Sequence, residues 1–404
     1  MSHRISRLLQ KITSSLSCEH STGCQRHISV PNYGHIKHGN QLTKYGHHVM
    51  RLLSTYHLPR DFPESLSTLP KIEQIVDSPV TFLGIEYLQN DEIFYLLEHI
   101  QKLIGTKHPI VEFGAQTLLG STGTFKIHGL IVLLLAQITN SGSTSSRLTR
   151  DSVGILPKQR RLVEVCEMIS TAFFLHDNIV NVNDKQPNLQ KGNKLSLLFG
   201  DYFLATACSQ LATMENPAVV DSVSKAISSN VEGRFWLETI EPSDPPSVND
   251  LSYYCSLRHG ALMASCCYST ALLSGLDEGT AKTYKALGEH IGQAIHLKKE
   301  IFVTEMNNII GPESLSSYPF IAAVQMLNKS GQRGIVDKTG RLNEEDVRRV
   351  INLGHGLRLT SEQCDMHCSK ALDSLQKLDI DESITLNLAA IINDIRSSKP
   401  IFTA

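Results

Sequence analysis

Asp177, Asn178 and Asn181 lie at positions i, i+1 and i+4 of a predicted helix, a spacing that brings three side chains close together. Three carboxylates at this spacing would hold a cluster of divalent cations, because Mg²⁺ prefers charged oxygen ligands. Here only Asp177 is an acid, and the two asparagines offer neutral carbonyl oxygens, which are weaker ligands for Mg²⁺. The pattern therefore has the outline of a metal-dependent diphosphate site that has lost most of its metal ligands.

The elements that would position these side chains are predicted to be helices. Residues 162–183, which carry Asp177, and residues 127–138 have the apolar pattern of buried helices. No stretch alternates polar and apolar residues between hairpin signals, so no β-strand is predicted. The longest apolar run, LIVLLLA at 130–136, is far shorter than the roughly 18 residues that a membrane span needs. We therefore expect one large all-α domain over residues 61–404, without a transmembrane segment.

Composition and charge exclude several classes of protein. The chain has 404 residues, of which 41% are hydrophobic and 19% charged, and this is typical of a globular protein with a sizeable core. The formal net charge of -2 gives no basic footprint for nucleic acid at the level of the whole chain. We therefore expect no nucleic-acid partner.

The nine cysteines show no paired spacing, which favours reduced thiols in a reducing compartment. Cys364, His367 and Cys368 weakly resemble half of a metal site, but no second half with zinc-ligand spacing follows. The alternative is that Cys364 and Cys368, at i and i+4, share one helix face.

The first sixty residues differ in composition from the rest. They contain one acid, Glu19, against eight arginines and lysines, with serines at 14, 15 and 17. Apolar residues at 5, 8, 9 and 12 fall on one helical face, and basic residues fall largely on the other. This pattern is typical of a mitochondrial transit peptide, so we expect residues 1–60 to be a transit peptide and flexible segment of a mitochondrial matrix protein. The alternative is a basic tail that carries no targeting signal.

Several segments in order resemble the trans-polyprenyl diphosphate synthases. They resemble most closely the divergent second subunit of the decaprenyl or solanesyl diphosphate synthases of animals. The segments are LHDNIVN at 175–181, GNKLSLLFGDYFLA at 192–205, HGALM at 259–263 and GQAIHLKKEIFV at 292–303. The resemblance runs from about residue 70 to the C-terminus, which makes it more specific than one short motif. It implies the isoprenoid synthase fold, an all-α helical bundle around a central cavity.

In that family an allylic diphosphate ionises to a carbocation that isopentenyl diphosphate attacks. Two Asp-rich motifs hold the Mg²⁺ ions that neutralise the leaving diphosphate. The resemblance places the first motif on residues 177–181, where only Asp177 of three acids survives. It places the acids of the second motif on Lys299, Glu300 and Val303. Six expected acids are thus reduced to two, and a lysine beside a Mg²⁺ site repels the cation.

The basic residues that clamp diphosphate in the family are also incomplete. The resemblance places the clamp on residues 124–129, where Lys126 keeps a charge and His128 can keep part of one. His259 stands where the family has the lysine of a Lys-Thr pair. Lys126, His128 and Lys194 are the possible phosphate contacts.

The resemblance and the missing acids together predict a divergent subunit of a heteromeric mitochondrial trans-polyprenyl diphosphate synthase that makes the ubiquinone side chain. We expect the chain to lack catalytic competence, to contribute no catalytic residue and to bind no metal or cofactor. A catalytic partner subunit would hold the Mg²⁺, and isoprenyl diphosphates would interact with this chain only as part of the complex. The resemblance implies a hetero-oligomer, with a heterotetramer as the expected assembly.

Two other functions remain open. One is an independently active prenyltransferase with a reshaped site that uses Asp177, Glu300 and Lys194. The other is a non-enzymatic isoprenoid-binding or regulatory protein on the same scaffold, with no synthase partner.

Simpler roles are also open for single residues. Asp177 and Asp184 are at i and i+7 and would share a solvated helix face. Residues 298–300, Lys-Lys-Glu, would form an ordinary surface charge patch, and His176 would be an interior histidine with a satisfied ring.

Overall fold

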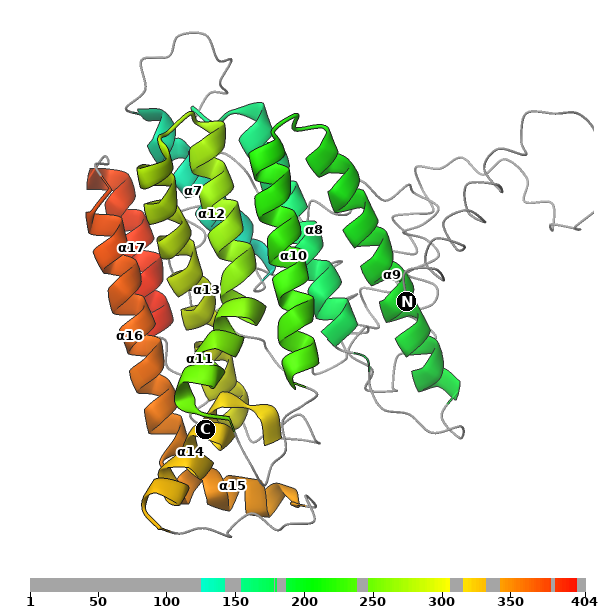
Figure 1. Cartoon of the computed structure of the whole chain (residues 1–404), viewed down its shortest axis with the longest axis vertical. Helices are drawn as coiled ribbons and strands as arrows, with labels where there is room; N and C mark the ends of the chain where they lie inside the picture. The colour runs from blue at the N-terminus through cyan, green and yellow to red at the C-terminus, as the bar shows by residue number, and fades with distance from the viewer. Residues whose placement is uncertain are drawn as a thin grey trace, which may run out of the picture. The chain divides into compact units, whose positions relative to one another are not determined.

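Every regular element that the structure describes is a helix, as the sequence predicts. The computed structural model describes residues 125–141, 154–177, 179, 187–237, 246–305, 315–331, 342–378 and 382–397. Within these ranges there is no β-strand. The helices (Figure 1) are α7 (Phe125–Ser141), α8 (Pro157–Asp177), α9 (Pro187–Ala212), α10 (Pro217–Leu237), α11 (Val248–Cys255), the π-helix η2 (Ser256–Gly260), α12 (Ala261–Leu273), α13 (Glu278–Glu305), α14 (Tyr318–Lys329), α15 (Glu344–Leu353), α16 (Gly356–Gln376) and α17 (Glu382–Ser397).

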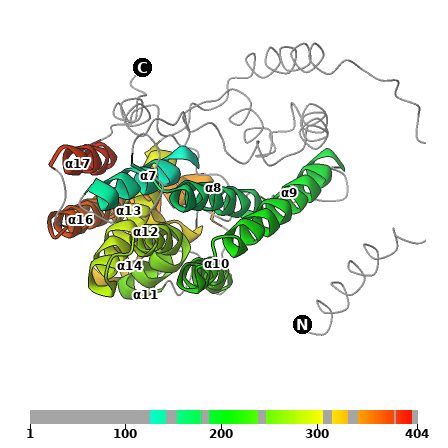
Figure 2. The same cartoon turned by 90° about the horizontal axis from the view of Figure 1, so that it is seen from above.

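The helix α12 lies at the centre of the packing. It contacts α7, α8, α10 and α13, and Figure 2 shows it among these helices when the bundle is seen from above. Its sequence, ALMASCCYSTALL, is apolar or small on every side, and nine of its 13 residues are buried. A helix that is apolar all round is typical of a core position. On α7, residues 130–136 are each at most 2% exposed, which confirms the predicted buried helix.

The helix α13 packs closely against the preceding elements through glycines. It contacts α12, η2 and α16. A Cβ atom added at Gly288 would lie 2.5 Å from the carbonyl oxygen of Met263, and one added at Gly292 would lie 2.4 Å from that of His259. Both neighbours are backbone atoms, so there is no room for a side chain at either glycine. These contacts hold α13 against η2 at the level of His259.

The structure corrects one predicted helix. The sequence pattern predicts a helix over residues 162–183, but α8 begins at Pro157 and ends at Asp177, and Ile179 is not helical. Proline is well tolerated at the first helical position, where its missing N–H has no intrahelical partner. The apolar pattern continues past the helix end, which is why periodicity misplaces it. Asp177 is thus the last residue of α8, and the predicted spacing to Asn178 and Asn181 concerns residues outside the described ranges.

Two of the sequence predictions concern parts of the chain that fall beyond the described ranges. These are the transit peptide at residues 1–60 and the domain boundary at residue 61. The residues that are described all belong to one compact unit of the chain. Of the helices in the described ranges, none is both long enough and apolar enough to cross a membrane.

Replacing Gly292 by alanine is expected to destabilise the fold by about 2 kcal/mol, because the new methyl group meets a backbone oxygen that no rotamer change can move. Gly279→Ala is the matched control, since its Cβ would approach only the exposed side-chain oxygen of Asp277. Thermal unfolding measures both variants. An unchanged midpoint for Gly292→Ala would contradict the close approach of α13 to η2.

Candidate functional site

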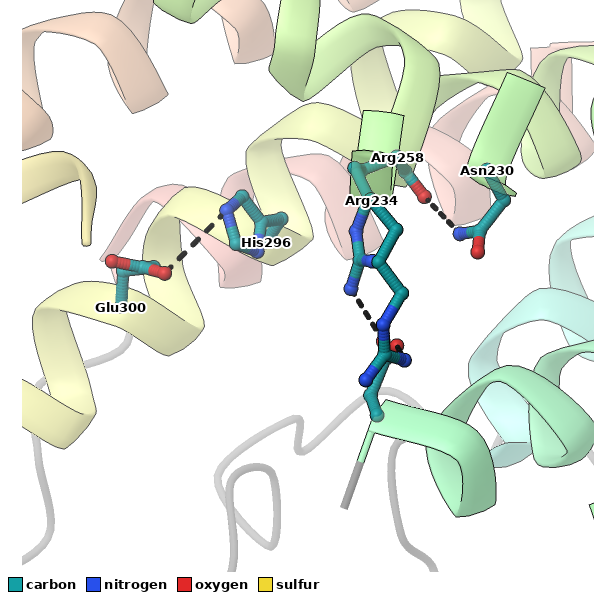
Figure 3. A network of polar contacts seen from close by, with 6 residues as sticks. Asn230, Arg234, Arg258, His296 and Glu300 are labelled. Carbon is teal, nitrogen blue, oxygen red and sulfur yellow. Dashed lines mark hydrogen bonds and ion pairs between the residues drawn. The ribbon is translucent and has the colours of Figure 1, made fainter. Parts of the chain in front are cut away.

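Asp177 is held between two arginines. Arg234 donates from Nη1 to Oδ1 of Asp177, and Arg258 donates from Nη2 to Oδ2, each at 2.5 Å. Figure 3 shows the Arg234 and Arg258 side chains lying close together, beside Asn230. The side chain of Arg258 is 8% exposed, while those of Asp177 and Arg234 are 30% and 38% exposed. We call these three residues the Asp177 cluster; in it, both carboxylate oxygens already bind a charged donor.

Three elements bring the Asp177 cluster together. Asp177 ends α8, Arg234 lies in the last turn of α10, and Arg258 lies within η2. Gly233 leaves space for Arg258, because a Cβ there would lie 2.7 Å from Cγ of that arginine. Asn230 donates its side-chain N–H to the carbonyl oxygen of Arg258 at 2.9 Å. A π-helical turn is rare and is often found at functional sites, and here it sets the direction in which Arg258 leaves the helix.

The Asp177 cluster has the wrong charge for a Mg²⁺ site. Two guanidinium groups against one carboxylate leave a net charge of +1. A divalent cation would be repelled and would find both oxygens engaged. In the part of the chain that the structure describes, no group of three or more His, Cys, Asp or Glu side chains is placed to hold a metal ion. The residues present therefore do not fit the Mg²⁺ that the family resemblance implies.

A row of rings runs from α10 to α13 beside the Asp177 cluster. Trp236 stacks on Tyr254, with ring centroids 5.2 Å apart and an interplanar angle of 25°. Tyr254 meets His259 edge to face at 6.2 Å, and His259 stacks on His296 at 3.3 Å and 8°. Such contacts favour defined ring orientations. The row therefore fixes the backbone on either side of Arg258.

The two stacked histidines carry no charge at physiological pH. Burial is the main cause that lowers the pKa of both rings, and the positive charges of Arg258 and Lys299 lower them further. The pKa of His296 falls to about 3. The stacked imidazoles therefore add no positive charge to that of Arg258 and Lys299.

Glu300 is not the surface residue that a charge patch would contain. Its side chain is 22% exposed and its Oε1 lies 3.6 Å from Nε2 of His296, while its Oε2 accepts a hydrogen bond from the backbone N–H of Tyr318 at 2.9 Å. Burial raises the pKa of Glu300 to about 7, although the Tyr318 hydrogen bond and Lys299 act in the opposite direction. A carboxyl group that keeps its proton near neutrality is a poor ligand for Mg²⁺. Lys299 itself is exposed, as a surface charge would be.

The other predicted site residues lie apart in the chain or beyond the described part of it. Lys126 and His128 are both on α7, where His128 is half-buried. Lys194 is exposed on α9. Asn178 and Asn181 lie outside the described residues. A role in phosphate contact for Lys126, His128 and Lys194 stays a prediction.

His176 has a packing partner in the next helix. Its Nε2 lies 3.3 Å from Oδ1 of Asp201, and the His176 side chain is 25% exposed. Gly200 makes room for the ring, because a Cβ there would lie 2.3 Å from that nitrogen. This contact joins the end of α8 to α9 and does not involve the Asp177 cluster. Asp184 lies outside the described residues.

The sequence motifs predict neither Arg234 nor Arg258 as a site residue. Arg258 directly precedes His259, the position matched to the lysine of the family's Lys-Thr pair. A positive side chain one residue before that position could therefore have indicated Arg258 as a site residue. Arg234 had no such signal, since it lies 57 residues from Asp177 and in none of the matched segments.

The cysteine pair on α16 belongs to the core. Cys364 and Cys368 are 2% and 0% exposed, and the Cys364 thiol donates to the carbonyl oxygen of Ala294 at 3.5 Å. The alternative of two cysteines on one helix face is therefore confirmed. All seven cysteines within the described ranges are free thiols, which agrees with the prediction of reduced cysteines.

Part of the chain matches a known family model. Residues 116–298 match the family described as polyprenyl synthetase. All trans-polyprenyl-diphosphate synthase PDSS2 of Homo sapiens is 28% identical over 328 residues, which cover 77% of this chain and 82% of that protein. The probable mitochondrial hexaprenyl pyrophosphate synthase of Yarrowia lipolytica is 28% identical over 258 residues, which cover 59% of this chain and 57% of that protein.

Solved structures have the same fold. A decaprenyl diphosphate synthase from Rhodobacter capsulatus superposes with a TM-score of 0.60 at 16% identity, covering 82% of this chain and 99% of that one. A geranylgeranyl pyrophosphate synthase from Bacteroides thetaiotaomicron superposes with a TM-score of 0.59 at 20% identity, again covering 82% and 99%. The predicted all-α isoprenoid synthase bundle is therefore confirmed.

Glu300→Gln is expected to remove a pH dependence of stability. The folded protein keeps the Glu300 proton up to about pH 7, whereas the unfolded chain releases it near the ordinary pKa of 4.5. The natural chain therefore loses stability on this account as the pH rises through that window, by roughly 3 kcal/mol. The glutamine variant should accordingly gain in unfolding midpoint relative to the natural chain between pH 5 and pH 8.

The control for this experiment is Glu362→Gln, which removes a glutamate that is 54% exposed on α16. Its midpoint relative to the natural chain should stay nearly constant over the same range. His296 contributes an opposite slope, but it is present in all three proteins and largely cancels in the differences. A flat difference for Glu300→Gln would contradict the buried, protonated carboxyl.

Proposed function

Because this chain carries a domain of the polyprenyl synthetase family, we propose that it is a divergent subunit of a mitochondrial trans-polyprenyl diphosphate synthase. A catalytic partner subunit would hold the Mg²⁺ ions and ionise the allylic diphosphate. This chain would lack that competence alone and would stabilise the partner and shape the elongation cavity. The product would supply the side chain of ubiquinone in the mitochondrial matrix.

The observation that carries this proposal is the pairing of Asp177 with both Arg234 and Arg258. Departure of a diphosphate needs concentrated positive charge at the leaving oxygens, which active family members obtain from Mg²⁺ held by carboxylates. Here the surviving acid of the first motif neutralises arginines instead. The acid of the second motif, Glu300, keeps its proton up to about pH 7. Neither residue supports ionisation of an allylic diphosphate by this chain alone.

The relatives support the mitochondrial part of the proposal. The chain is homologous to PDSS2 and to the hexaprenyl pyrophosphate synthase of Yarrowia lipolytica, whose name places it in mitochondria. The acid-poor, amphipathic pattern of residues 1–60 agrees with import into this organelle.

Exposed apolar side chains on α9 and α10 support a protein partner. Leu198 on α9 is 54% exposed and Phe235 on α10 is 70% exposed. Leu197, next to Leu198, and Val231, one turn before Phe235, are also exposed. The two helices touch each other and lie on the side of the bundle away from α16 and α17 (Figure 2). Large apolar side chains in water are typical of interaction sites, and aromatic residues often dominate the binding energy. We propose that the catalytic subunit packs here, in a heterotetramer as the family resemblance implies.

The purified chain alone is expected to make no polyprenyl product from farnesyl diphosphate, isopentenyl diphosphate and Mg²⁺, because its two remaining acids do not hold the metal. Co-expression with a catalytic polyprenyl diphosphate synthase subunit, in cells that lack their own synthase, should yield a long-chain quinone. Mass spectrometry identifies the side chain. Turnover by the lone chain would contradict the proposal, as would an unchanged quinone yield when this chain is left out.

The double variant Leu198→Asp and Phe235→Asp is expected to weaken binding of the catalytic subunit by about thirtyfold or more, because it puts charges into the proposed apolar interface. Leu386→Asp is the control, since this leucine is 62% exposed on α17, on the far side of the bundle. Co-purification and a binding titration measure the effect. Equal retention of the partner by both proteins would move the interface away from α9 and α10.

A further inference from the structure

Arg258 has hydrogen-bond donors that the protein does not use. Its Nη2 bonds to Asp177, but its Nε and Nη1 are buried and have no hydrogen-bond partner. The side chain is only 8% exposed, so bulk water does not satisfy these donors. Leaving a charged donor buried and unpaired is costly, and an unsatisfied buried group of this kind points to a bound ligand or ion.

Positive charge around Arg258 exceeds what the nearby acids neutralise. Asp177 is shared with Arg234, so one carboxylate faces two guanidinium groups. Lys299 lies one turn after His296 on α13, and its charge, like that of Arg258, lowers the pKa of the stacked histidines. Below neutral pH Glu300 offers little compensation, because burial raises its pKa to about 7. The site therefore attracts an anion.

We propose that Arg234 and Arg258 bind a diphosphate group directly, with no divalent cation between protein and ligand. The guanidinium fork matches phosphate oxygens, and two forks can serve two phosphoryl units. In the ligand-free chain, Asp177 holds both guanidinium groups in position, and the diphosphate replaces this carboxylate as their acceptor. Access is from the more open side of the cluster, where Arg234 is 38% exposed.

The anion site rests on the geometry of the cluster, whereas its assignment to a diphosphate rests on the proposed function. The two proposals fail separately. Formation of a complex with a catalytic subunit is measured without any ligand, and diphosphate binding is measured on the full chain alone.

Isothermal titration calorimetry of the purified full chain with inorganic pyrophosphate in EDTA tests the proposal. We expect binding without a divalent cation, and Arg258→Gln should weaken it by about tenfold or more, because charge-assisted donors are lost. Arg358→Gln is the matched control, since Arg358 is an exposed arginine that pairs with Glu362 one turn away on α16. Its affinity should equal that of the natural chain.

The Asp177→Asn variant separates direct binding from metal-mediated binding by the sign of its effect. In the proposed site it removes the carboxylate that competes for both arginines, so pyrophosphate should bind several-fold more tightly in EDTA. In a Mg²⁺ site, titrated with Mg²⁺ in place of EDTA, the same change removes a ligand and weakens binding. If circular dichroism shows that this variant is unfolded, Arg234→Gln takes its place, and it should weaken binding in EDTA as Arg258→Gln does.

Three results would overturn the proposal: no binding in EDTA, binding that depends on Mg²⁺, or an affinity that Arg258→Gln leaves unchanged. Farnesyl diphosphate in a parallel titration distinguishes the sources of the diphosphate. Tighter binding of farnesyl diphosphate assigns the site to the head group of an isoprenoid. Equal affinities assign it to free pyrophosphate, and both outcomes support direct binding by the arginines.

Discussion

A single carboxylate shared by two guanidinium groups determines the chemistry of this site. Asp177 stands where the family resemblance places a metal-binding motif, but Arg234 and Arg258 engage both of its oxygens. Arg258 is only 8% exposed, and an unpaired charge at such a position costs about 3–5 kcal/mol. The acid is therefore needed to hold Arg258, whether or not a metal is ever bound. This explains why an acid stands here although amides follow it at 178 and 181.

The scaffold around the cluster depends on small residues at points where backbones or side chains approach closely. Gly233 leaves room for the side chain of Arg258, and Gly292 allows α13 to pack directly against the backbone of η2. The π-helical turn then directs Arg258 toward α8 while His259 stacks on α13. These contacts involve no metal ligand. The packing of these helices therefore does not depend on acidic metal-binding side chains.

The sequence predicts the helical class and the core because these follow from local patterns. The apolar run at 130–136 predicts a buried helix, and the structure has one there. Cys364 and Cys368, four residues apart, both pack into the core from one helix face. The end of α8 at Asp177 escapes prediction because the apolar pattern continues beyond it. Arg258 escapes because it lies 81 residues from Asp177, and no periodicity relates positions so far apart. Pairing across helices is a tertiary property that one sequence does not display.

The buried titratable groups show how the site keeps its positive charge in the arginines and Lys299. His259 and His296 lie against Arg258 and Lys299, and burial together with these charges keeps both rings neutral. If either ring were protonated, it would repel the arginine that the row of rings positions. Glu300 lies beside His296, where ionisation is opposed by burial. The histidines thus add no charge to the arginines and Lys299, whereas Glu300, with a pKa of about 7, becomes negatively charged as the pH rises through neutrality and then weakens the positive field.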